Sequence, residues 1–106
     1  MPGSRAELIK SPQCLIDLFE IAKYLADQHP ELGHRFLIRA EETMNLLASN
    51  PLIGESFVIP GEPNLRAKLI REFKRYVIYY RSSTERVVVV RVLHGSRDTK
   101  NELTQG

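Results

Sequence analysis

The chain has 106 residues, of which 42% are hydrophobic and 26% are charged, and its formal net charge is +2. These values predict one domain with a modest core of about two layers. No apolar run approaches the ~20 residues that span a bilayer, and residues 1–5 are not followed by the apolar core of an export signal. Because Cys14 is the only cysteine, no internal disulfide is possible, and we expect a reducing, cytoplasmic setting.

The charge is divided unequally along the chain. Residues 1–64 carry five Lys or Arg and nine Asp or Glu, whereas residues 65–100 carry ten and three. We therefore expect the C-terminal half to present a basic face. Such a face suits nucleic acid, whose phosphates attract clustered arginines, or an acidic protein segment that covers it. A solvated sheet face with scattered arginines is the simpler alternative.

Residues 6–10 predict a short first strand, and Ser11-Pro12 predicts the start of a helix over 12–28. Serine suits the N-cap, and proline is tolerated in the first turn because its missing N–H would be unpaired there. We expect Cys14 to be a small apolar helix residue and not a nucleophile. The expected apolar stripe consists of Leu15, Leu18, Phe19, Ala22, Leu25 and Ala26. The residues expected away from it are Asp17, Glu20, Lys23 and Asp27.

His29-Pro30 predicts the end of this helix and the start of a second one, which Asn50-Pro51 ends. The very short connection indicates an antiparallel helical hairpin. His29 and His34 have a spacing that metal ligands use, but no cysteine or third histidine lies near them, so we expect no metal and no cofactor. The apolar stripe of the second helix consists of Phe36, Leu37, Ala40, Met44 and Leu47.

Residues 51–64 are rich in Pro and Gly and predict a loop, in which 57–59 is a candidate for brief pairing with the sheet edge. A strand is expected from Leu65, turning near Glu72-Phe73 into a β-hairpin whose loop is 82–85. The unbroken valine run 87–90 favours a central position for the second hairpin strand. In the first hairpin strand, alternation places Tyr76, Ile78 and Tyr80 on one face and Val77, Tyr79 and Arg81 on the other. The pattern does not show which of these two faces packs against the helices.

This order of elements predicts an α+β fold. It consists of an N-terminal strand, an antiparallel helical hairpin and a mainly antiparallel sheet of three further strands, arranged in two layers. We expect a single domain over residues 1–106, in which residues 99–106 form a polar, frayed tail.

Several motifs within residues 5–98 resemble a known family. They are Asp17-Leu18, Glu20-Ile21, Tyr24, Pro30, Arg35-Phe36, Leu47, Asn50-Pro51, Gly54, Leu65-Arg66, the run 76–81 and the closing run 91–98. The chain resembles the RelE/ParE superfamily of bacterial toxins from type II toxin–antitoxin modules, most closely the ParE-like plasmid stabilisation proteins. The resemblance implies a cytoplasmic toxin that arrests growth and is neutralised by a cognate ParD-like antitoxin. It further implies that the antitoxin binds operator DNA and wraps the toxin with its C-terminal segment. ParE-like toxins are described as inhibitors of DNA gyrase, whereas RelE-like toxins cut mRNA in the ribosome, and the shared fold does not decide between them.

The nuclease alternative requires a base for the ribose 2′-OH, cations for the phosphate and an acid for the leaving oxygen. Histidine is a common general acid–base residue, so His94 is paired with Arg81 as the alternative catalytic set. However, no Tyr or His follows His94 to complete a RelE-like site. The candidate cations are Arg66, Arg71, Arg75, Arg81 and Arg91.

The gyrase alternative requires only a stable binding surface, for which Arg and Tyr are suitable residues, and it implies a protein that is not an enzyme. An amphipathic antitoxin segment would lie in an apolar groove, or an acidic strand would pair with a sheet edge. At least one of Tyr76 and Tyr80 is expected in the core. A third functional alternative is that the chain is an inactive relative of these toxins that only binds its partner. The expected antitoxin- or target-binding residues are Arg66, Arg71, Arg75, Tyr79, Arg81, Arg91, His94 and Arg97.

Overall fold

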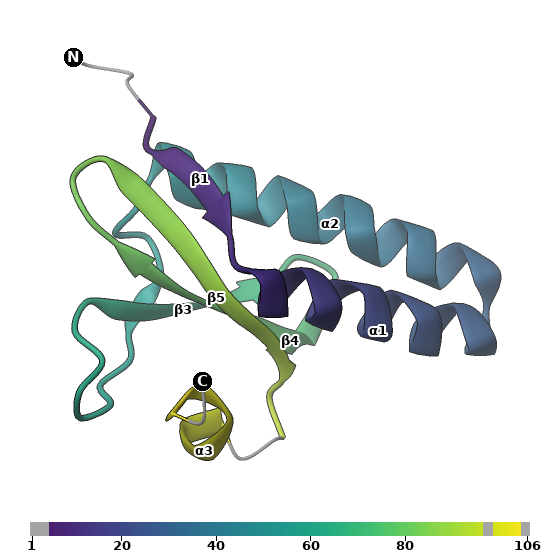
Figure 1. Cartoon of the computed structure of the whole chain (residues 1–106). Helices are drawn as coiled ribbons and strands as arrows, with labels where there is room; N and C mark the ends of the chain where they lie inside the picture. The colour runs from purple at the N-terminus through teal and green to yellow at the C-terminus, as the bar shows by residue number, and fades with distance from the viewer. Residues whose placement is uncertain (1–4, 97–98, 105–106) are drawn as a thin grey trace.

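The computed structural model describes residues 5–96 and 99–104. Figure 1 shows a helical hairpin on one face of a twisted sheet and a short helix on the other. No helix in the described part of the chain is long and apolar enough to cross a membrane. In chain order the elements are β1 (Glu7–Lys10), α1 (Pro12–Gln28), α2 (Pro30–Ser49), β2 (Glu55–Ser56), β3 (Leu65–Ile70), β4 (Phe73–Ser82), β5 (Arg86–His94) and α3 (Thr99–Thr104).

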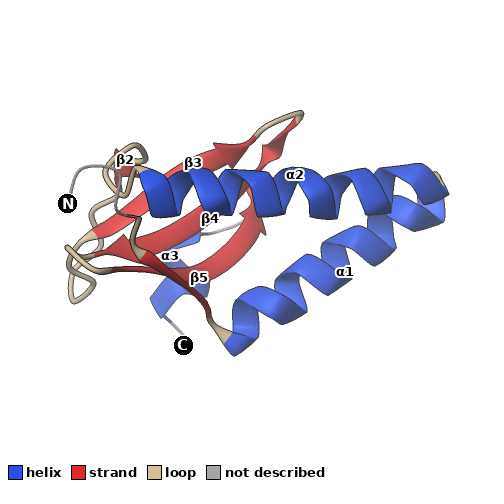
Figure 2. Cartoon of the chain, turned by 90° about the horizontal axis from the view of Figure 1, so that it is seen from above, coloured by secondary structure: helices blue, strands red, loops and turns tan. Residues whose placement is uncertain are grey.

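The two long helices begin and end where local signals place them. The Ser11 hydroxyl accepts a hydrogen bond from the Cys14 N–H at 3.0 Å and so caps α1. His29 is extended, with φ −158°, and separates α1 from α2. The helices run antiparallel and side by side, as expected (Figure 2). A Cβ on Gly33 would lie 2.5 Å from the Ala22 carbonyl oxygen, so this glycine permits their close approach.

The sheet has the strand order β1-β5-β4-β3-β2. β1 pairs with β5 in parallel and the other pairs are antiparallel, so the sheet is mixed. The valine-rich strand β5 is an interior strand between β1 and β4, so it is not at an edge, as predicted, although the central strand of the five is β4. Edge pairing with β3 occurs at Glu55–Ser56, and of the expected residues 57–59 only Phe57 joins it, donating to the Leu65 carbonyl oxygen at 2.9 Å. Ile59 forms an isolated bridge with Glu62.

The two faces of β4 belong to two different apolar clusters, and the face with Ile78 and Tyr80 is the one that packs against the helices. Ile78 and Tyr80 are completely buried under the helical hairpin, with Tyr76 packed against the same cluster. Val77 and Tyr79 belong to a smaller cluster on the opposite face. The expectation that at least one of Tyr76 and Tyr80 is a core residue is therefore confirmed.

The expected apolar stripe of α1 is partly wrong. Leu15 and Phe19 are 52% and 68% exposed, whereas Cys14 and Asp17 are buried. On α2, Leu37 is likewise 41% exposed. The buried face of α1 is the one that carries Cys14 and Asp17, whose carboxylate binds groups of β5, and the Leu15 and Phe19 side faces solvent.

The expectation of a frayed tail is wrong for residues 99–104. These residues form α3, and Leu103 is only 4% exposed in the cluster with Tyr79 and Leu93. α3 therefore adds a short third layer to the predicted two, while residues 105–106 lie outside the described part of the chain. The helix is docked by Leu103 together with hydrogen bonds of Arg91 with Glu102 and of Tyr79 with Thr99, which its mostly polar sequence does not reveal.

Cys14 is a core residue, as the sequence predicts. Its side chain is completely buried, and burial together with the nearby Asp17 carboxylate raises the pKa of the thiol to about 12. At neutral pH the group is therefore protonated and inaccessible, which are not the properties of a nucleophile.

Candidate functional site

A β-bulge in β5 shapes the surface beneath α1. Tyr79 pairs with Arg91 and Tyr80 pairs with Val89, so Val90 is an extra residue on β5. The bulge changes the alternation of the strand, because Val87 and Val89 before it and Val92 after it all face the helices. Arg91 is thereby placed where it reaches elements on both sides of the sheet.

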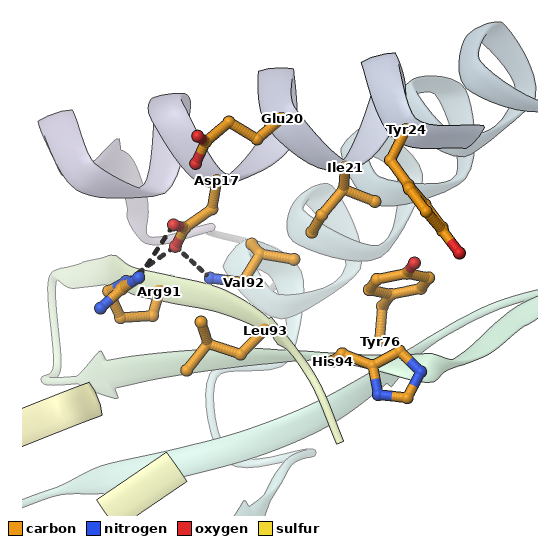
Figure 3. Close-up of a pocket in the computed structure, with 9 residues that line it drawn as sticks. All are labelled: Asp17, Glu20, Ile21, Tyr24, Tyr76, Arg91, Val92, Leu93 and His94. Atoms are coloured by element: carbon orange, nitrogen blue, oxygen red, sulfur yellow. Dashed lines mark hydrogen bonds and ion pairs between the residues drawn. The ribbon is translucent and has the colours of Figure 1, made fainter. Parts of the chain in front are cut away.

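Arg91 and Asp17 form a bidentate ion pair between β5 and α1 (Figure 3). Arg91 Nε donates to Asp17 Oδ2 at 2.8 Å and Nη2 donates to Oδ1 at 3.0 Å. The Val92 N–H also donates to Asp17 Oδ2 at 3.0 Å. On the other side, Arg91 Nη1 donates to the Glu102 carbonyl oxygen at 3.2 Å. The hydrogen bond with Asp17 raises the pKa of Arg91, so this cation is fixed within the fold.

Two adjoining hollows follow the junction of α1 with β4 and β5. One has a volume of about 400 Å³ and is lined by Asp17, Glu20, Ile21, Tyr24, Tyr76 and residues 91–94. The other, of about 470 Å³, is lined by Tyr24, Leu25, Gln28, residues 72–76 and His94. Because they share Tyr24, Tyr76 and His94, we treat them as one site and call it the aromatic groove.

His94 lies at the floor of the aromatic groove in a fixed orientation. Its Nδ1 accepts a hydrogen bond from the Ser96 N–H at 3.1 Å and lies 2.7 Å from the Ser96 hydroxyl. A backbone N–H can only donate, so this geometry assigns the ring proton to Nε2. The imidazole stands edge-on to Tyr76, with ring centroids 5.2 Å apart.

The alternative catalytic pair, His94 and Arg81, is not assembled. His94 lies opposite Tyr76 in the β4–β5 ladder and shares its face, whereas Arg81 shares the opposite face with Tyr79. Their positions are also separated by about 17 Å along β4, at ~3.4 Å per residue. Arg81 forms an ion pair with Glu62, on the side of the sheet away from the helical hairpin.

Two more expected binding residues have internal roles. Arg66 Nη1 donates to the carbonyl oxygens of Gly54 at 2.7 Å and Leu52 at 3.3 Å, which secures the loop after α2. Tyr79 is only 4% exposed and packs on Phe57 with centroids 5.2 Å apart. Burial raises the pKa of Tyr79, while a hydrogen bond with the Thr99 side chain opposes the shift. Both side chains therefore have partners within the fold.

Arg71 and Arg75 are the exposed members of the expected set, and Arg75 lines the aromatic groove. Arg97 lies outside the described residues. Tyr24 and Lys74, which also line the groove, were not expected as binding residues. One signal for Tyr24 exists, because it follows Asp17 by two helical turns and so lies on the same flank of α1.

No group of three or more His, Cys, Asp or Glu that could hold a metal occurs within residues 5–96 and 99–104.

A family model described as the ParE toxin of the type II toxin–antitoxin system parDE matches residues 8–99. A solved structure titled "Chromosomal ParDE TA system from P. aeruginosa" aligns with a TM-score of 0.71 at 14% identity, covering 86% of this chain and 97% of that one. At that identity the likeness shows the fold alone. A comparison with curated proteins gave no match.

Proposed function

This chain belongs to the family of ParE toxins of type II toxin–antitoxin systems, and from that premise we propose that it arrests growth by inhibiting DNA gyrase until a cognate antitoxin covers it. The inhibition is by binding and requires no reaction of the toxin itself. The target in this proposal is a large protein, and the toxin supplies a rigid surface of arginine and aromatic side chains.

The dispersal of the candidate catalytic groups carries this proposal. His94 and Arg81 lie on opposite faces of the sheet, and Arg66, Arg81 and Arg91 are engaged by internal partners. Phosphate cleavage without a metal would need an acid–base group and free cations that converge on one point. Arg75 lines a hollow with His94, but the predicted partner Arg81 lies on the other face of the sheet, so the geometry favours the gyrase alternative over a nuclease built on His94 and Arg81.

Three residues of the expected binding set are suitably placed for contacts with a partner. Arg71 and Arg75 are exposed at the end of the sheet where β3 turns into β4. His94 is partly exposed beside them, at the end of β5. We assign target binding to this end of the sheet, because these side chains are not required to hold the core together.

An apolar surface on α1 is suitable for the antitoxin. Leu15, Ile16 and Phe19 are 52%, 50% and 68% exposed on successive turns of the first half of the helix. Exposed apolar side chains gathered in this way indicate an interaction surface. An amphipathic segment laid along α1 would cover them. Neutralisation then requires a partner with an apolar face and does not require chemistry.

We expect Arg81→Ala, expressed at the wild-type level, to go on arresting bacterial growth, and His94→Ala, which removes one contact of the proposed binding surface, to weaken the arrest without abolishing it. The reason is that neither side chain performs a chemical step in a binding mechanism. Growth curves after induction measure the arrest, and RNA sequencing of the arrested cells is expected to find mRNA uncut. Abolished arrest in either variant, with antitoxin binding preserved and with mRNA cut in wild-type arrest, would replace this function with the nuclease alternative.

A further inference from the structure

The aromatic groove presents rings from three different elements. Tyr24 comes from α1, Tyr76 from β4 and His94 from β5, and Figure 3 shows them gathered at one end of the site. Tyr76 is held between the edges of Phe36 and His94, with centroid distances of 5.4 Å and 5.2 Å. Tyr24, by contrast, is 59% exposed. The groove thus combines a fixed ring below with an accessible ring above.

Cations line the outer margin of the same groove. Lys74 and Arg75 are exposed and form no ion pair or side-chain hydrogen bond with any described residue. Burial raises the pKa of the Tyr76 hydroxyl and Tyr24 adds to the shift, whereas Arg75 lowers it, which places the Arg75 charge near this ring. Arg71, in the adjoining turn, is exposed as well.

Most of the acids in the groove are already neutralised. Asp17 is paired with Arg91, and Glu72 accepts from Arg39 Nε at 2.6 Å. Glu20 is the acid among the lining residues that has no partner within the described part of the chain. Among the groove residues without an ion-pair partner, the two cations Lys74 and Arg75 outnumber the one acid, Glu20. The net charge of these side chains is therefore positive, which complements a phosphate.

We propose that the aromatic groove binds single-stranded nucleic acid, with a base stacked on Tyr24 and its phosphate held by Lys74 and Arg75. Exposed rings beside free cations are the elements from which single-strand binding sites are built. Each hollow is larger than the ~300 Å³ at which small-ligand sites begin. The His94 Nε2–H supplies a donor for a base edge. An acidic peptide would satisfy the cations but would leave the rings without a stacking partner.

This inference goes beyond the proposed function and does not depend on it. The binding is measured on the isolated chain in the absence of gyrase. Failure of the gyrase proposal leaves the groove and its prediction intact, and failure of oligonucleotide binding leaves inhibition of gyrase untouched.

The test is fluorescence anisotropy of labelled oligothymidylate and oligouridylate titrated with the whole chain at low salt. We expect saturable binding that Tyr24→Ala weakens roughly 5- to 100-fold, the range for loss of one stacked base, and that Tyr24→Phe preserves. Arg75→Ala is expected to weaken binding and to reduce the salt slope by about 0.7, the value for one phosphate contact on a single strand. Binding of either oligonucleotide supports the proposal, and their ratio reports whether the 2′-OH is contacted.

The matched control is Arg86→Ala, which removes an arginine with 63% side-chain exposure at the opposite end of β5. It should leave the affinity unchanged. Equal weakening by Arg86→Ala and Arg75→Ala, no effect of Tyr24→Ala, or displacement of the oligonucleotide by polyglutamate of equal charge would each overturn the proposal. Circular dichroism of each variant establishes that the fold is retained.

Discussion

Asp17→Ala is expected to lower the free energy of unfolding by ~3–5 kcal/mol, the usual cost of removing one partner from a buried ion pair. The substitution leaves the Arg91 guanidinium, 15% exposed, without its bidentate carboxylate. It also leaves the Val92 N–H without its acceptor beneath α1. Both losses fall at the bulge, where β5 meets α1 and α3. Urea denaturation followed by circular dichroism measures the change.

Glu41→Ala is the matched control for this prediction. It removes a carboxylate from the Lys10–Glu41 ion pair, whose side chains are 27% and 49% exposed. Exposed pairs contribute about 0–1 kcal/mol, so the control should be nearly neutral. If Asp17→Ala proved as mild as Glu41→Ala, the pair would have no structural role, and Arg91 would return to the set of candidate binding residues.

Gly54→Ala is expected to lower the free energy of unfolding by ~2–4 kcal/mol, through overpacking and broken hydrogen bonds together. A Cβ at this position would lie 2.5 Å from the Tyr80 hydroxyl and 2.8 Å from the Ala67 carbonyl oxygen. The buried Tyr80 hydroxyl also accepts from the Gly54 N–H and donates to the Pro51 carbonyl oxygen, each at 2.9 Å. The new methyl group must displace the side chain of a completely buried tyrosine. Thermal and urea unfolding give the magnitude.

Gly95→Ala is the control for the glycine prediction. There the nearest atom to a Cβ would be the Arg75 carbonyl oxygen at 3.4 Å, an ordinary contact, and the residue is exposed. We expect a change within about 0.5 kcal/mol, as for most surface substitutions. A Gly54→Ala protein as stable as Gly95→Ala would mean that the loop after α2 shifts freely and that Tyr80 does not anchor it.

The two long helices and the positions of the main strands along the chain could be predicted because their signals are local. Ser11-Pro12 and His29-Pro30 each combine a stop or cap with a start, so the bounds of α1 and α2 follow from neighbouring residues alone. The alternation along β4 likewise defines two faces from one stretch of chain. These features need no knowledge of what packs against them.

The orientation of α1 could not be predicted, because it depends on a distant residue. Apolar residues occur on more than one side of the helix, and the side that is buried is the one that brings Asp17 to Arg91, 74 residues later. The β-bulge at Val90 could not be predicted from the sequence for a different reason. In a run of four valines, a change of face leaves no trace in composition.

The candidate site was predicted only as a set of residue types. A surplus of arginines after residue 65 indicated a basic face, but it could not tell which arginines have internal partners. Arg66 and Arg91 are fixed by contacts within the fold, while Arg75 is free at the aromatic groove. Tyr79 is buried, and Tyr24, for which no binding role was predicted, lines the groove, because burial depends on which face α3 covers and on which flank of α1 faces β5.

A supercoiling assay tests the proposed inhibition of gyrase most directly. Purified DNA gyrase and relaxed plasmid are incubated with this chain, with and without its antitoxin, and the topoisomers are separated on a gel. The expected result is loss of supercoiling or accumulation of cleaved plasmid, relieved when antitoxin is added. Gyrase that supercoils normally in the presence of a chain that arrests growth in cells would contradict the proposal and direct the search to mRNA on translating ribosomes.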